Sequence, residues 1–171
     1  GLLIITDAIE KYIPIKKGKK HVLRVIREIL YFQPHGKHTN IRLGLETLNR
    51  VLTRRAVIFV ISDFIDVDYG KSLKILAQDN DVIAVHVFDP REMSIPNVGY
   101  AAFEDPESGE TMVINTKDAR FRQRFSHNTE AWKTQLNDYF TSLGVDKIDI
   151  DITKSYIDPI RAFFAMRERR L

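Results

Sequence analysis

The chain has 171 residues, a formal net charge of +3, 44% apolar residues and 29% charged residues. This length suits one domain with its own core, and the composition is ordinary for a globular protein. The absence of cysteine excludes disulfides, thiolate catalysis and cysteine metal sites, and it fits a reducing compartment, so we expect a cytoplasmic protein. The longest apolar run, residues 56–61, is far shorter than a membrane span, so we expect no membrane partner.

Charge is distributed unevenly along the chain. Residues 1–60 carry 12 Lys and Arg against 4 Asp and Glu, whereas residues 61–120 carry 5 against 12. Such asymmetry favours a polarised surface that meets a partner. The basic first third contains no helix-turn-helix, zinc finger or aromatic ribonucleoprotein motif. We therefore expect an acidic protein surface as its partner, and nucleic-acid binding is the alternative.

The first third of the chain predicts two strands and a helix. Residues 2–6 are apolar and predict a short buried strand, and residues 11–15 alternate, with a proline that favours a sheet edge. Apolar residues then recur at helical spacing between Val22 and Leu30, which predicts a helix with its apolar face inward. The lysine cluster before this helix could meet an anion or could serve solubility alone.

Residues 34–40 predict a loop before the next helix. Its two histidines, His35 and His38, lack a third ligand at a useful spacing, so we interpret them as exposed loop residues. Thr39 or Asn40 is expected to cap the helix that follows.

The stretch around which we expect the chain to be organised is residues 54–66. Residues 56–61 are apolar without alternation, which predicts a strand buried on both faces. Ser62 and Asp63 follow it. Ligands bind beyond the carboxyl ends of parallel strands, so Asp63 is a candidate oxygen ligand. The alternative is that Asp63 only caps a turn.

The remaining elements complete an α/β pattern. Residues 82–88 predict a buried strand in which His86 is a hydrogen-bonded core histidine. We expect the following elements after it: an inserted β-hairpin over about residues 97–115, a long helix from Asp118 to Leu143, an edge strand over residues 145–152, and a last helix starting at Asp158–Pro159. The alternation predicts a single three-layer domain over residues 1–171 with a doubly wound, mostly parallel sheet, and residues 2–6, 56–61 and 82–88 as central parallel strands.

Several phrases of the sequence occur in a familiar order. They are Gly-Leu-Leu-Ile-Ile-Thr-Asp at residues 1–7, Thr39-Asn40, Val60-Ile61-Ser62-Asp63-Phe64, Phe88-Asp89-Pro90-Arg91-Glu92, residues 104–110 and Thr153-Lys154-Ser155-Tyr156. Together they resemble the bacterial domain-of-unknown-function 58 family, which is related to the von Willebrand factor A domain and is typically encoded beside MoxR-type AAA+ ATPases. The resemblance implies a Rossmann-like sheet of the von Willebrand factor A type.

The resemblance also implies a metal-ion-dependent adhesion site (MIDAS). Its loop threonine corresponds to Thr39 and its aspartate after the fourth strand to Asp63, and such oxygen ligands suit Mg²⁺ or Mn²⁺. The Asp-x-Ser-x-Ser motif of the site is absent. We therefore expect a fragment that starts at the second strand of the fold, holds an incomplete metal site and binds no ion by itself. Loss of the first strand should leave two open strand edges or force residues 2–6 against residues 56–61, and strand-mediated dimers would follow.

We expect the protein to be a non-enzymatic protein-interaction module. The family resemblance implies that it is an adaptor for a MoxR-type ATPase. A metal-dependent hydrolase that uses Asp63, Asp66 and Asp89 is the alternative. The sequence contains no His-Glu-x-x-His, Gly-x-Ser-x-Gly or phosphate-loop motif, which argues against an enzyme.

Overall fold

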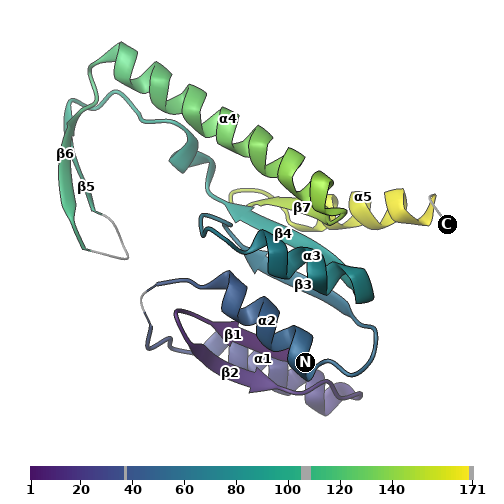
Figure 1. Ribbon diagram of the computed structural model, residues 1–171. Coiled ribbons are helices and arrows are strands. Elements are labelled where there is room, and N and C mark those ends of the chain that lie inside the picture. The colour runs from purple at the N-terminus through teal and green to yellow at the C-terminus, as the bar shows by residue number, and fades with distance from the viewer. Residues whose placement is uncertain (37, 105–108, 170–171) are drawn as a thin grey trace. The chain divides into compact units, whose positions relative to one another are not determined.

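The computed structural model describes residues 1–36, 38–104 and 109–169, and these form a mixed α/β structure (Figure 1). By its internal contacts the chain divides into two units. The first comprises residues 1–54 and 66–76, and the second comprises residues 55–65 and the described residues from 77 onward. Helix α3, Gly70–Asp79, is shared between the two units.

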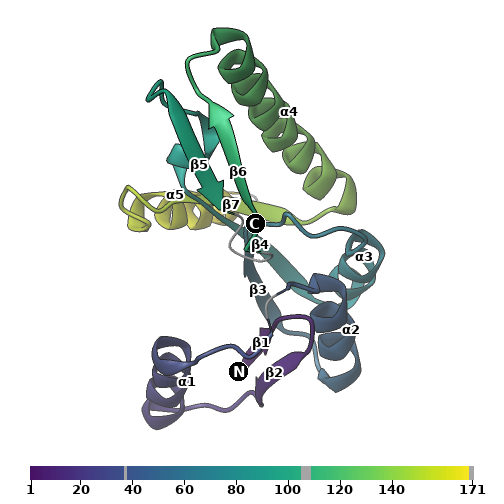
Figure 2. The same ribbon diagram turned by 90° about the vertical axis from the view of Figure 1, so that its left-hand side faces the viewer.

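The first unit is built on a β-hairpin. Strand β1, Leu2–Ile5, pairs antiparallel with β2, Ile9–Ile13, and helices α1, Lys19–Tyr31, and α2, Ile41–Val51, lie on opposite sides of the hairpin (Figure 2). Gly44 allows α2 to approach β1, because a Cβ there would lie 2.8 Å from the Cδ1 atom of Ile5. The prediction that residues 2–6 form a central parallel strand is wrong. Only three residues separate β1 from β2, and such a short connection permits antiparallel pairing alone.

The second unit contains the parallel sheet. Strands β3, Val57–Ser62, β4, Asp81–Phe88, and β7, Asp146–Asp151, pair in the order β3-β4-β7. Helices cover both faces. On one face, Phe163 of α5, Ile157–Glu168, packs against Ile83 and Ile148. The opposite face carries His86, whose ring meets Trp132 of α4, Ala119–Leu143, edge-on. The predicted parallel sheet is confirmed for these strands, and so is the edge position of β7.

Strand β3 departs from its prediction in burial. Ile58 is buried, but Val57, Phe59 and Ile61 on the other face are 47–68% exposed. These three side chains share their face with Ile83 of β4, because Phe59 is its register partner. Helix α5 covers the β4 and β7 part of this face and leaves the β3 part open. The expectation of burial on both faces is therefore wrong for β3.

The inserted hairpin and the long helix are confirmed. Strands β5, Tyr100–Glu104, and β6, Thr111–Asn115, pair antiparallel, and the tip residues 105–108 lie outside the described part. Asp118 caps α4 by accepting hydrogen bonds from the Arg120 and Phe121 amides, and Gly144 ends the helix with φ 68°. The last helix starts at Ile157, before the predicted Asp158–Pro159 start. Proline is tolerated there because the first turn of a helix needs no amide donor.

Strands β1 and β3 both end a sheet. Within the described residues β1 pairs with β2 and β3 pairs with β4, so the two strands do not pair with each other. A short 3-10 helix, η1, Pro90–Met93, follows β4. No helix of the described chain is long and apolar enough to span a membrane.

Candidate functional site

Asp63 lies in an exposed turn after β3. Its Oδ1 atom accepts hydrogen bonds from Ser62 Oγ at 3.2 Å and from the Ile65 amide at 3.3 Å, so Asp63 does cap a turn. Phe64 has a left-handed backbone with φ 59°, which is strained for a bulky residue, and its buried ring packs edge-on against Phe140 at 4.9 Å. The buried ring fixes this turn. Within the described residues, Asp63 Oδ2 accepts no hydrogen bond, and it can accept one from a ligand.

The loop that carries Thr39 is fixed to the first hairpin by Glu10. Glu10 Oε1 accepts hydrogen bonds from the amides of Gly36 at 2.8 Å and His35 at 3.0 Å, and from Thr6 Oγ1 at 3.0 Å. The bond from Gly36 is the largest of the effects that lower the pKa of Glu10 to about 2. Glu10 is therefore ionised at neutral pH. Thr39 itself is exposed, as a ligand-binding hydroxyl needs to be.

A second carboxylate stabilises the same loop where α2 begins. Asn40 caps α2, as predicted, because its Oδ1 atom accepts a hydrogen bond from the Leu43 amide at 2.9 Å. Asp66 Oδ2 accepts another from the Ile41 amide at 2.6 Å. Negative charge at a helix N-terminus is stabilising. Asp66 thus has a structural partner, which sequence spacing could not reveal because 25 residues separate it from Ile41.

The predicted metal ligands belong to different units, Thr39 to the first and Asp63 to the second. Their hydroxyl and carboxylate oxygens suit Mg²⁺ or Mn²⁺, but two ligands make an incomplete set. Among the described residues, no group of three or more His, Cys, Asp or Glu is arranged to hold a metal. The metal site remains a prediction. Asp89, a candidate of the hydrolase alternative, bonds to Arg91 Nε, and this bond lowers the pKa of Asp89.

The second unit contains a polar network of which the sequence predicted only His86. His86 is 2% exposed, and its Nδ1 lies 2.7 Å from Asp149 Oδ1, which confirms it as a hydrogen-bonded core histidine. Lys147 Nζ lies 2.6 Å from the same oxygen. Burial raises the pKa of Asp149, but the bonds from His86 and Lys147 outweigh burial and bring it to about 2. Because a carboxylate of such low pKa is a weak base, we interpret the network as structural.

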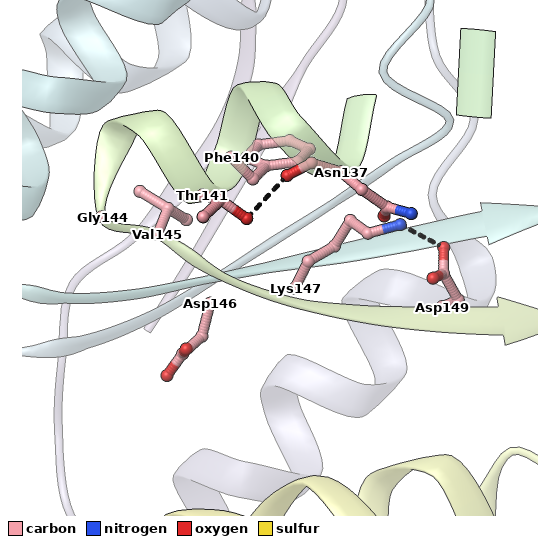
Figure 3. Close-up of a pocket in the computed structure, with 8 residues that line it drawn as sticks. All are labelled: Asn137, Phe140, Thr141, Gly144, Val145, Asp146, Lys147 and Asp149. Carbon is pink, nitrogen blue, oxygen red and sulfur yellow. Dashed lines mark hydrogen bonds and ion pairs between the residues drawn. The ribbon is translucent and has the colours of Figure 1, made fainter. Parts of the chain in front are cut away.

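Lys147 and Asp149 also line a pocket of about 480 Å³ between β7 and the end of α4 (Figure 3). The Lys147 ammonium points toward Asp149, with the Asn137 side chain nearby, whereas Asp146 points away from them. The alternation of acidic and apolar residues over residues 145–152 predicted an edge strand. It could not predict that Asp149 pairs with His86 in the adjacent strand β4.

Helix α1 carries the most exposed apolar surface in the first unit. It has no buried residue, and five of its large apolar side chains are 46–71% exposed: Val22, Leu23, Ile26, Ile29 and Leu30. These five residues are called the α1 stripe below. The prediction that the apolar face of this helix points inward is therefore wrong. The helix instead contacts the hairpin through its polar edge, where Glu28 Oε2 lies 3.0 Å from Lys11 Nζ.

Cations gather around the N-terminal part of α1. Lys16, Lys17, Lys19, Lys20 and Arg24 are exposed, and within the described part of the chain none of them forms a salt bridge. His21 Nε2, in the first turn of α1, is buried without a hydrogen-bond partner in the described structure. A short helix with a bare apolar stripe is marginal in water by itself. Together the stripe and its cations form a candidate surface for another molecule.

The comparisons with known proteins point to one family. The model of the family described as "Protein of unknown function DUF58" matches residues 1–135. The uncharacterized proteins Rv1480 of Mycobacterium tuberculosis and Mb1516 of Mycobacterium bovis are each 26% identical to this chain over 172 residues, which cover 99% of it. The chain spans about half of these relatives, 54% of their length. The uncharacterized protein MAV169 of Mycobacterium avium is 26% identical over 92% of this chain and 94% of its own length. No solved structure matches the chain.

Proposed function

The chain belongs to the DUF58 family of proteins of unknown function. We propose that it is a non-enzymatic module that binds other proteins. The observation that carries the proposal is the α1 stripe. Exposed apolar patches with a polar rim mark interaction sites on proteins. The unpaired cations beside the stripe favour a partner that presents acidic residues around an apolar core, because opposite charges steer association and fix its orientation.

The exposed face of β3 supports the same proposal. Val57, Phe59 and Ile61 are open to solvent on the part of the sheet face that α5 leaves uncovered, and the outer edge of β3 has no strand partner among the described residues. An open apolar strand edge recruits another strand. We propose that the sheet is of the von Willebrand factor A type, and that its missing first strand would pair at this edge in a longer protein.

For the metal, we propose a site of the MIDAS type that is complete only in a longer protein. There Thr39 and Asp63 would supply a hydroxyl and a carboxylate, and a bound Mg²⁺ or Mn²⁺ would supply a coordination position for an acidic group of the partner. The exposure of both side chains supports these roles. The association with a MoxR-type ATPase rests on the family resemblance alone.

The test of the interaction proposal is a binding measurement with a defined probe. The probe is a fluorescent amphipathic peptide of leucine and glutamate heptads, followed by anisotropy. Ile26→Glu should weaken binding about tenfold or more, because it places a charge in the α1 stripe. Val67→Glu is the matched control, since Val67 is 72% exposed in the same unit but lies outside the stripe.

Two results would contradict the proposed function. One is equal probe binding by wild type and Ile26→Glu. The other is metal-dependent turnover of a generic phosphate ester or peptide that Asp63→Ala abolishes, because this would support the hydrolase.

A further inference from the structure

The pocket between the end of α4 and strand β7 is formed by residues between 137 and 149, all in the second unit (Figure 3). Gly144 makes the turn from helix to strand, and its amide donates a hydrogen bond to the Thr141 carbonyl at 3.1 Å. The Val145 amide donates another to the carbonyl of the buried Phe140 at 3.0 Å. These bonds hold the pocket wall in place without a ligand. The volume of about 480 Å³ is that of a small-molecule site.

Lys147 brings a nearly buried ammonium group to this pocket. Its side chain is 9% exposed, and it lies on the same face of β7 as Asp149, two residues further along the strand. Lys147 Nζ donates a hydrogen bond to Asp149 Oδ1 at 2.6 Å and to no other group of the described residues. An ammonium group has three donors, so two are left for a molecule in the pocket. A buried donor without a partner is destabilising, and a ligand that accepts these bonds removes this cost.

Two further side chains of the pocket have unused hydrogen-bonding groups. Asp149 Oδ1 serves both His86 and Lys147, whereas Asp149 Oδ2 accepts no hydrogen bond within the described part of the chain. Asn137 is exposed, and among the described residues only its backbone carbonyl, which accepts from Thr141 Oγ1, has a side-chain partner. The pocket therefore offers donors on Lys147, an acceptor on Asp149, and both kinds of group on the Asn137 amide.

The charges of the pocket disfavour a charged ligand. Because Lys147 Nζ lies 2.6 Å from the Asp149 carboxylate, a charged ligand group would meet both signs at similar distances and would gain little. Asp146 points away from this pair, and its carboxylate lies 3.6 Å from Arg167 Nε (Figure 3). A hydroxyl group is neutral, and it both donates and accepts hydrogen bonds. Adjacent hydroxyl groups on one ring therefore suit the donors and acceptors of this pocket.

We propose that the pocket binds a neutral ring rich in hydroxyl groups, such as a sugar or a cyclic polyol. One hydroxyl donates to Asp149 Oδ2 and accepts from Lys147 Nζ, and a neighbouring hydroxyl bonds to the Asn137 side chain. His86 Nδ1, at 2.7 Å from Asp149 Oδ1, holds the carboxylate in position. The inference goes beyond the proposed function and does not rest on it, because the α1 stripe belongs to the first unit.

The test is a titration of the whole chain followed by heteronuclear NMR of its amide groups. The probes are methyl glucoside, methyl galactoside and myo-inositol, which are neutral and carry no aldehyde that reacts with lysine. We expect at least one of them to shift the signals of residues 137–149, including the Asn137 side-chain amide. The Kd should be about 1–10 mM, as suits a ligand of about 12 non-hydrogen atoms. Glycine and inorganic phosphate, the charged probes, should bind at least about tenfold more weakly.

Two variants test the residues of the site. Asn137→Ala removes no hydrogen bond that the side chain makes within the described structure, and it should weaken binding of the neutral probe about fivefold. Asp138→Asn is the matched control, because Asp138 is exposed next to it on α4 but does not line the pocket. Asp149→Asn leaves the Lys147 ammonium without its carboxylate. It should weaken the neutral probe and bind phosphate at least about tenfold more tightly than wild type does. A variant that merely unfolds would not gain affinity for phosphate.

Three results would overturn the inference. One is that no neutral probe shifts the signals of the pocket residues at about 50 mM, well above the expected Kd. Another is binding that Asn137→Ala leaves as tight as the Asp138→Asn control. The third is a wild type that binds glycine or phosphate as tightly as the neutral probe. None of these results bears on the α1 stripe, so the proposed function is tested separately.

Discussion

Replacing Asp149 tests the polar network of the second unit. Its carboxylate joins His86, which is 2% exposed, and Lys147, whose side chain is 9% exposed. Asp149→Ala would leave both groups buried without this partner. Asp149→Asn would retain an oxygen that accepts the hydrogen bond from His86 and would remove only the charge.

The pKa of Asp149 sets the expected change in the free energy of unfolding. It lies at about 2 against an ordinary value of 3.8, a difference that corresponds to about 2 kcal/mol. The side chain is 35% exposed, so screening by solvent reduces the contribution of the charge to about 1 kcal/mol. We expect Asp149→Asn to lower the free energy of unfolding by about this amount. We expect Asp149→Ala to lower it by about 3 kcal/mol, because two buried polar groups lose a partner.

The assay is urea unfolding followed by the fluorescence of Trp132. This is the only tryptophan of the chain, and its ring centroid lies 5.6 Å from that of His86, so it reports on the second unit. The pKa of Asp149 is depressed in the folded state. Its contribution is therefore present at neutral pH and is lost as the pH falls from about 5 toward 2. The wild type should lose more stability than Asp149→Asn over this interval.

Asp138→Asn is the matched control, because Asp138 is exposed on α4 and should change the free energy of unfolding by less than about 0.5 kcal/mol. The reasoning is refuted if Asp149→Ala costs no more than this control, or if wild type and Asp149→Asn lose stability in parallel below pH about 5.

Two further predictions concern the candidate metal site. Gly36→Ala should lower the free energy of unfolding by about 1–3 kcal/mol, because the added Cβ would collide with Thr6 Oγ1 and the Asp7 carboxylate. Thermal melts are the measurement, and an unchanged melting temperature would show that the loop adjusts freely. In titration calorimetry this chain should bind Mg²⁺ more weakly than about 1 mM, and Asp63→Ala should not change that affinity. A longer protein that carries Asp-x-Ser-x-Ser should bind Mg²⁺ more tightly and should lose this affinity on Asp63→Ala. Tight binding by this chain that survives Asp63→Ala would place the metal site elsewhere.

The elements that the sequence predicted well are those whose signals are local. The long helix α4 is bounded by Asp118 and Gly144, and both act as the caps that their residue types predict. The β5–β6 hairpin follows from two strand-like runs around a turn-rich segment. The strand character of residues 57–62 follows from their β-branched composition. In each case the residues that decide the structure are neighbours in the sequence.

The sequence did not predict which strands pair with each other or which element buries each apolar face. Strand composition did not reveal that β1 pairs with β2 instead of joining the parallel sheet. Helical periodicity predicted an apolar face for α1 but not whether another element covers it. Of the candidate site, Asp63 came from its position after a predicted strand and from the family resemblance, whereas Thr39 came from the resemblance alone, and their pairing remains a prediction. Glu10, which fixes the loop of Thr39, acts on residues about 25 positions away.

The free energy of unfolding of Ile26→Glu tests most directly whether the α1 stripe is a recognition surface and not part of the core. Far-ultraviolet circular dichroism in urea is the measurement, with Leu45→Glu as the core control, because Leu45 is 2% exposed in α2 of the same unit. We predict that Ile26→Glu stays within about 0.5 kcal/mol of wild type, whereas Leu45→Glu costs about 3 kcal/mol or more. A loss for Ile26→Glu as large as that for Leu45→Glu would show that the stripe is buried in the folded protein and would contradict the account.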